Sequence, residues 1–195
     1  LKNGFFHDKS LPQPFTNINF EIQSRCPDHN YRNTSLSLEN LDIQALNNYI
    51  KGYFRLKNAD NFPVESSLDA SVRLAEIGQF YPLDSMELGG NLLVKMSSNG
   101  NYQPEKKLFP KTEANFKVEN GTLKTKYYPT PITQIVVDAT VRNQEGTLGD
   151  LNVDIKPVSF QFEGKPFMIQ ADLRDFNNLQ YNIISKGEID LGKIY

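Results

Sequence analysis

Two stretches of this chain, 117 residues apart, are variants of one sequence. Residues 11–22 and 128–139 share both prolines of a Pro-x-Pro motif, and they also share a threonine and an isoleucine at matching places. The same offset relates Asn3-Gly4 to Asn120-Gly121. A repeat of this length constrains the fold more than any other feature, because both copies are expected to form the same local structure.

The repeat predicts two units in one continuous array. The first unit is expected to cover residues 1–117 and the second residues 118–195, where it stops before its copy is complete. Residues 77–81 and 191–195 also resemble each other, at an offset of 114. Strands that expose an apolar face and open edges depend on neighbours, so units of this kind form stacked arrays. We therefore expect the chain to be cut from a larger protein.

Apolar and polar residues alternate in short stretches along the chain. Ile18, Phe20 and Ile22 fall on one face of an extended strand, whereas the residues between them fall on the other. The same alternation recurs at residues 68–74, 92–96, 158–163, 167–173 and 187–191. With 13 Phe, 9 Tyr, no Trp, 12 Gly and 11 Pro, the composition is typical of many short strands joined by turns. The pattern predicts a mostly-β, antiparallel fold.

Turns and helices are expected at a few places. Three dipeptides have the composition of turns between strands, namely Asn120-Gly121, Glu145-Gly146 and Glu163-Gly164. Residues 41–53 place apolar side chains at 43, 46, 49, 50 and 53, and this spacing predicts a short amphipathic helix. A further helical turn is expected at residues 76–80. The expected fold therefore includes one or two short helices.

Charge and hydropathy argue against several classes of protein. Lys and Arg number 21 and Asp and Glu number 23, and the resulting net charge of −2 argues against a nucleic-acid partner. Lys106, Lys107 and Lys111 form a small basic cluster that we expect in a solvated loop, with a lipid headgroup contact as the alternative. The apolar runs are far shorter than the roughly 20 residues of a membrane-spanning helix, and residues 1–10 carry no signal-peptide pattern.

The sequence contains no catalytic motif that we could identify. Cys26 and His29 have a Cys-x-x-His spacing, but the only other histidine is His7, so a tetrahedral zinc site would lack ligands and a surface turn is expected instead. Most carboxylates lie at the polar positions of alternating strands, and no glycine-rich phosphate-binding motif occurs. We therefore expect a non-enzymatic protein that uses no cofactor or metal.

Three motifs together resemble the AsmA family of Gram-negative envelope proteins, in particular its Bacteroidetes-type members. They are Asn-Gly, which occurs in both copies, Leu-Pro-x-Pro-Phe-Thr-Asn-Ile at residues 11–18, and Leu-Ala-Glu-Ile-Gly-Gln-Phe-Tyr-Pro-Leu at 74–83 with an echo at 189–195. The resemblance covers nearly the whole chain. It implies that the chain is a periplasmic portion of a protein held in the inner membrane by a helix outside this sequence. It also implies that the repeated strands curl into a long groove that carries phospholipid during outer-membrane assembly.

The resemblance brings no catalytic residue to any position of this chain, but it suggests which side chains contact lipid. The groove candidates are the apolar residues of three expected strands: Ile18, Phe20, Ile22, Ile135, Val137, Ala139, Val141, Phe160 and Phe162. The same side chains would equally line a closed protein core, in a module that binds envelope proteins or further repeats through its sheet edges. A carbohydrate-binding sandwich is a third hypothesis, which the absence of Trp makes less attractive.

Overall fold

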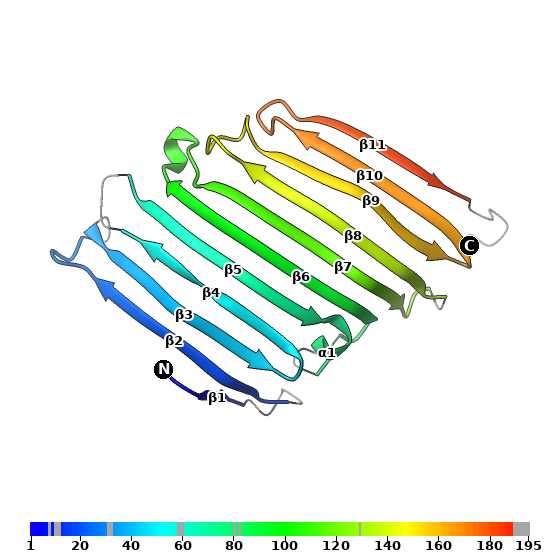
Figure 1. The fold of residues 1–195 in the computed structure, drawn as a ribbon, viewed down its shortest axis with the longest axis horizontal. Helices are drawn as coiled ribbons and strands as arrows, with labels where there is room; N and C mark the ends of the chain where they lie inside the picture. The colour runs from blue at the N-terminus through cyan, green and yellow to red at the C-terminus, as the bar shows by residue number, and fades with distance from the viewer. Residues whose placement is uncertain are drawn as a thin grey trace.

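The computed structural model describes residues 1–7, 9, 13–30, 33–57, 61–79, 81, 83–128 and 130–188. These residues form one antiparallel sheet in which every strand pairs with its neighbours along the chain (Figure 1). Its eleven strands are β1 (Gly4–Phe6), β2 (Phe15–Arg25), β3 (Ser35–Ala45), β4 (Asn48–Leu56), β5 (Pro63–Arg73), β6 (Met86–Asn101), β7 (Lys111–Thr125), β8 (Ile132–Asn143), β9 (Asn152–Phe162), β10 (Lys165–Arg174) and β11 (Gln180–Gly187). The mostly-β, antiparallel prediction is confirmed.

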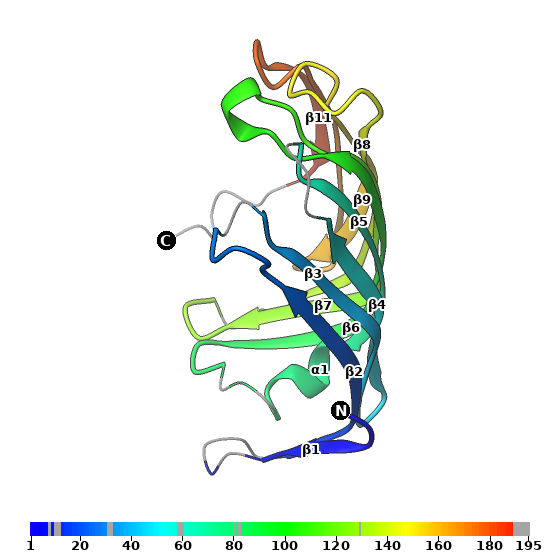
Figure 2. The same cartoon turned by 90° about the vertical axis from the view of Figure 1, so that its left-hand side faces the viewer.

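The sheet is open and curved, with β1 at one edge and β11 at the other. Figure 2 shows the curvature from the side, and α1 (Leu74–Ile77) lies on the concave side. A 3-10 helix, Pro104–Lys106, lies between β6 and β7. The expected curled sheet with one or two short helices is thus confirmed. α1 overlaps the helical turn expected at residues 76–80, of which Phe80 lies outside the described residues.

The helix predicted for residues 41–53 is wrong, because this segment is a β-hairpin. β3 ends at Ala45, a turn follows, and β4 begins at Asn48. Ile43 and Ile50 lie opposite each other in the two strands, so a spacing that resembles helical turns arises here from a chain that folds back on itself. Leu46 has a φ of 54°, which suits a tight turn and not an α-helix.

Two of the expected turn dipeptides have different outcomes. Glu163-Gly164 is the tight turn between β9 and β10, with φ values of 51° and 73° that match a two-residue hairpin turn. Asn120-Gly121 is not a turn, because it lies inside β7 at a bulge where the pairing with β8 shifts. One type of bulge, like the primed turns, has a residue with positive φ, and Asn120 has a φ of 52°. The composition of a dipeptide alone does not distinguish a hairpin turn from a bulge inside a strand.

The 117-residue repeat recurs in the backbone geometry. Gly4 pairs with Ile18 between β1 and β2, and Gly121 pairs with Ile135 between β7 and β8. β3, β4 and β5 begin at residues 35, 48 and 63, whereas β9, β10 and β11 begin at 152, 165 and 180. The expected boundary at 117/118 lies inside β7, so the two units share a strand and their division stays a prediction. The similarity at residues 191–195 falls outside the described residues.

The described residues form a single layer with almost no fully buried core. The buried apolar residues are all alanines, namely Ala45, Ala70, Ala114 and Ala171. The accessible surface is 13,005 Å², compared with about 9,400 Å² expected for a compact monomer of this mass. Among the described residues, no second layer therefore packs against most of the apolar face of the sheet.

Candidate functional site

The concave surface of the sheet is apolar along rows that cross the strands. In one row, each residue lies opposite the next on the neighbouring strand: Ile43, Ile50, Ala70, Val94, Phe116, Ala139, Ile155, Ala171 and Ile183. We call these nine residues the central row. Opposed residues point to the same face of a sheet. Ile43 and Ile50 share a cavity with Ile77 of α1, which places the central row on the concave side.

A second apolar row runs beside the central row, two positions along each strand. It consists of Leu41, Gly52, Leu68, Met96, Ala114, Val141, Val153, Leu173 and Tyr181. Neither row contains a charged residue. The two rows form a continuous apolar strip from β3 to β11 that no other described layer of the protein covers.

The nine groove candidates lie on this concave face, in two separate groups. Ile18, Phe20 and Ile22 are on β2, where Ile22 is opposite Leu38 and is 57% exposed. The other six are on β8 and β9, and Ala139 belongs to the central row. The sheet thus brings β8 and β9 together and keeps β2 apart from them. That these side chains bind lipid stays a prediction.

Aromatic rings gather at the hairpin that joins β9 and β10. Phe160 stacks on Phe167 with ring centroids 5.3 Å apart, and Phe162 stacks on Tyr128 at 5.1 Å. Phe162 also meets Phe167 edge-on at 6.0 Å. This cluster adds aromatic surface to the concave face at β8–β10.

Sequence reasoning misses the part of the strip between β3 and β7. Ile43 and Ile50 fall in the segment for which the spacing predicts a helix, and Val94 and Phe116 lie on strands whose facing could not be deduced without the register. The alternation at residues 68–74 and 92–96 was the available signal, because it marks strands with the same type of apolar face.

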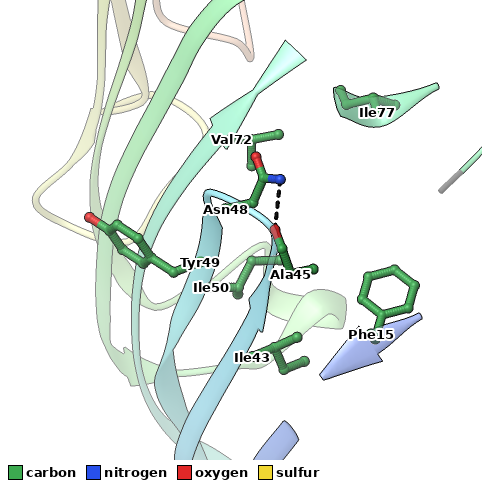
Figure 3. A pocket seen from close by; sticks show the side chains of 8 residues that line it. All are labelled: Phe15, Ile43, Ala45, Asn48, Tyr49, Ile50, Val72 and Ile77. Carbon is green, nitrogen blue, oxygen red and sulfur yellow. Dashed lines mark hydrogen bonds between the residues drawn. The ribbon is translucent and has the colours of Figure 1, made fainter. Parts of the chain in front are cut away.

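A cavity of about 140 Å³ lies beneath α1, at the end of the strip next to the β3–β4 turn. Its lining is almost entirely carbon and comes from Phe15, Ile43, Ala45, Asn48, Tyr49, Ile50, Val72 and Ile77 (Figure 3). The Tyr49 ring points away from the others in Figure 3, and its hydroxyl donates to Asp69 at 3.0 Å. The lining of the cavity therefore suits apolar groups and not polar ones.

A carboxylate holds α1 over the cavity. Glu76 accepts hydrogen bonds from the Asn47 side chain at 2.7 Å, the Asn47 backbone N–H at 3.3 Å and the Asn48 side chain at 2.8 Å. Arg73 lies 3.8 Å from the same carboxylate. These bonds tie α1 to the β3–β4 turn.

We expect this tie to weaken in acid. The hydrogen bond from Asn47 is the main cause that lowers the pKa of Glu76 below its usual 4.5, and Arg73 contributes less. A lowered pKa stabilises the folded state above the unfolded pKa, and this contribution is lost as pH falls through the folded pKa. The protection factor of the α1 amides, which is the intrinsic exchange rate at each pH divided by the observed rate, should therefore fall below about pH 4.5 in the native chain. Glu76→Gln should keep one protection factor throughout this range, and an unchanged pH response in that variant would contradict the assignment.

The convex surface is polar and carries cross-strand ion pairs. Arg55 contacts Glu39 at 2.6 Å and Glu65 at 3.2 Å, and Lys156 contacts Asp138 at 2.9 Å. The bond with Lys156 is the main cause that lowers the pKa of Asp138. These charged pairs make the convex surface hydrophilic, whereas the concave surface is apolar.

The remaining sequence motifs lie on loops. Cys26 is exposed and its thiol contacts the Asn30 carbonyl at 3.4 Å, within a turn. Lys106 and Lys107 are exposed at the 3-10 helix between β6 and β7. Within the described ranges, no group of three or more His, Cys, Asp or Glu side chains could hold a metal ion.

None of the helices in the described part of the chain is both long and apolar enough to span a membrane. Comparison of the chain with protein-family models, with curated proteins and with solved structures gives no match.

Proposed function

We propose that this chain is a non-enzymatic segment of an AsmA-like envelope protein and that its apolar concave strip shields phospholipid acyl chains during outer-membrane assembly. The observation that carries the proposal is the central row, which crosses nine strands without a polar residue and has no covering layer among the described residues. Exposed apolar areas of this extent mark binding surfaces in folded proteins.

The size of the strip suits acyl chains. Eight inter-strand steps of about 4.8 Å give the central row a length of roughly 38 Å. Half of a bilayer's hydrocarbon core is roughly 15 Å thick, so the strip can hold a whole acyl chain and still extend beyond it. The central row offers no side-chain hydrogen-bond partner, and Tyr181 at the β11 edge carries the one hydroxyl of the two rows, so a headgroup would lie at the rim of the strip or in water.

The proposed location and partners follow from the resemblance to the AsmA family. The chain would lie in the periplasm as part of a protein anchored in the inner membrane. Its partners would be phospholipid or another envelope lipid, further repeats of the same protein, and envelope proteins. Neither nucleic acid nor a cofactor enters the proposed function.

The second candidate is an interaction module that binds proteins through its sheet edges and carries no lipid. The edge strand β11 favours it, because all of its residues are exposed and Tyr181, Ile183 and Ile184 are among them. An exposed apolar edge can pair with a strand from another chain.

Lipid retention separates the two candidates. We expect the purified 195-residue chain to retain phospholipid after incubation with phosphatidylethanolamine–phosphatidylglycerol vesicles and size-exclusion chromatography, as measured by extraction and mass spectrometry. Chain without phospholipid, eluting as a dimer or larger assembly, would contradict lipid shielding and support the interaction module.

A further inference from the structure

We propose that the cavity beneath α1 holds the methyl end of an acyl chain, whose remaining length lies along the concave strip. α1 is then the end stop of the groove at β3–β5. This inference rests on the proposed function and adds the direction and the terminal site of the bound chain.

The chemistry of the cavity excludes a headgroup. Asn48 and Tyr49 are the lining residues with polar side-chain atoms. The Tyr49 hydroxyl is bonded to Asp69, and the Asn48 amide is already used in three hydrogen bonds. Its nitrogen donates to the Ala45 carbonyl at 2.9 Å and to Glu76 at 2.8 Å, and its oxygen accepts from the Arg73 backbone N–H at 2.6 Å. A polar ligand would find no partner here and would lose its hydration, whereas a hydrocarbon loses nothing.

The size of the cavity suits a short hydrocarbon segment. Its volume of about 140 Å³ is close to that of engineered apolar cavities of roughly 150 Å³, which bind small apolar molecules. Filling it would also restore the packing contacts that Ile43, Ile50 and Ile77 lack on one side.

The position of the cavity favours the end of a long chain over a compact ligand. Ile43 and Ile50 line the cavity and are also the first two members of the central row. A hydrocarbon that fills the cavity is therefore continuous with the strip. Glu76 fixes α1 to Asn47 and Asn48, so the helix stays in place over this part of the concave face.

Spin-labelled lipid tests the direction. We would label the isoleucine methyl groups of the 195-residue chain for NMR and add phosphatidylcholine carrying a doxyl group at carbon 5 or carbon 16 of one acyl chain. We expect the carbon-16 label to broaden the signals of Ile43, Ile50 and Ile77 at least fivefold more than the carbon-5 label does. The carbon-5 label should act mainly near the middle of the row, at residues such as Val94, whose methyl groups would be labelled in a second sample.

The outcomes distinguish this inference from the proposed function. Equal broadening of all concave isoleucines by both labels would overturn the end-stop inference and leave lipid shielding intact. No broadening of any concave isoleucine by either label would overturn both.

A cavity-filling variant gives a second readout. Ile77→Phe should lower the carbon-16 broadening at Ile43 at least threefold, because the added ring occupies the cavity that the acyl-chain end would fill. Ile184→Phe, on β11 but on the face opposite to the central row, is the matched control and should leave the broadening at Ile43 unaltered. An Ile77→Phe variant with full broadening at Ile43 would contradict the inference.

Discussion

Val137→Asp is expected to lower the phospholipid retained by the chain at least tenfold. Val137 lies on the concave face, opposite Val118, and is half-buried among apolar neighbours. A carboxylate there must lose water when an acyl chain covers it, and an unpaired charge in an apolar environment costs more than the ~1.4 kcal/mol that corresponds to tenfold in binding. Extraction and mass spectrometry after vesicle incubation measure the effect.

The neighbouring residue provides the control for this substitution. Val136 is also a valine of β8, but it is opposite Ser159 on the convex face and is 43% exposed. Val136→Asp should therefore retain lipid at the level of the unchanged chain, since its carboxylate stays in water. Equal loss in both variants would show a folding defect, and equal retention would contradict the concave strip as the lipid site.

Gly90→Ala is expected to lower the melting temperature of the chain by about 2–12 °C. Gly90 has a φ of 98°, and an added Cβ would lie 2.6 Å from the Glu119 carbonyl oxygen and 2.7 Å from the Cα of Gly121. Both neighbours are backbone atoms of β7, so neither can move without breaking the pairing of β6 with β7. Strain of this kind costs about 1–3 kcal/mol, and each kcal/mol shifts the melting temperature by about 2–4 °C in a domain of this size.

Gly78→Ala is the matched control for Gly90→Ala. Gly78 has a φ of −59° and an added Cβ would meet no atom within 4 Å. The substitution should leave the melting temperature unchanged or raise it slightly, because alanine has less freedom in the unfolded chain. A Gly90→Ala variant as stable as Gly78→Ala, by thermal circular dichroism, would contradict the close approach of β6 and β7.

The sequence predicts which face of each strand is apolar, but it does not predict what covers that face. Alternation at Ile18, Phe20 and Ile22 reveals which side chains share a face, and the sheet confirms it. Alternation is the same whether a second layer, a partner or a lipid covers that face. The open single layer could therefore not be deduced from the pattern, and the expectation of a groove came from the family resemblance.

The pairing register, which sets the residues that lie opposite each other on neighbouring strands, is also not visible in the sequence. The repeat is visible at Pro14 and Pro131, where residue types coincide. It continues through β10, where Phe167 pairs with Gly187 just as Ile50 pairs with Ala70 in the first copy. Main-chain hydrogen bonds preserve this geometry although the side chains differ, so the later strands of the repeat could not be recognised from sequence. The helix error at residues 41–53 has the same origin, because only the pairing of Ile43 with Ile50 shows the hairpin.

Photo-crosslinking at two adjacent positions tests the central claim most directly. A benzophenone amino acid placed at Val137 faces the concave side, directly beside Ala139 of the central row, and the same group placed at Val136 faces the convex surface. After irradiation with phosphatidylethanolamine–phosphatidylglycerol vesicles, we predict a phospholipid adduct by intact-protein mass spectrometry at position 137 and none at position 136. Adducts of protein alone at position 137, or equal phospholipid adducts at both positions, would contradict the proposal that the concave strip shields acyl chains.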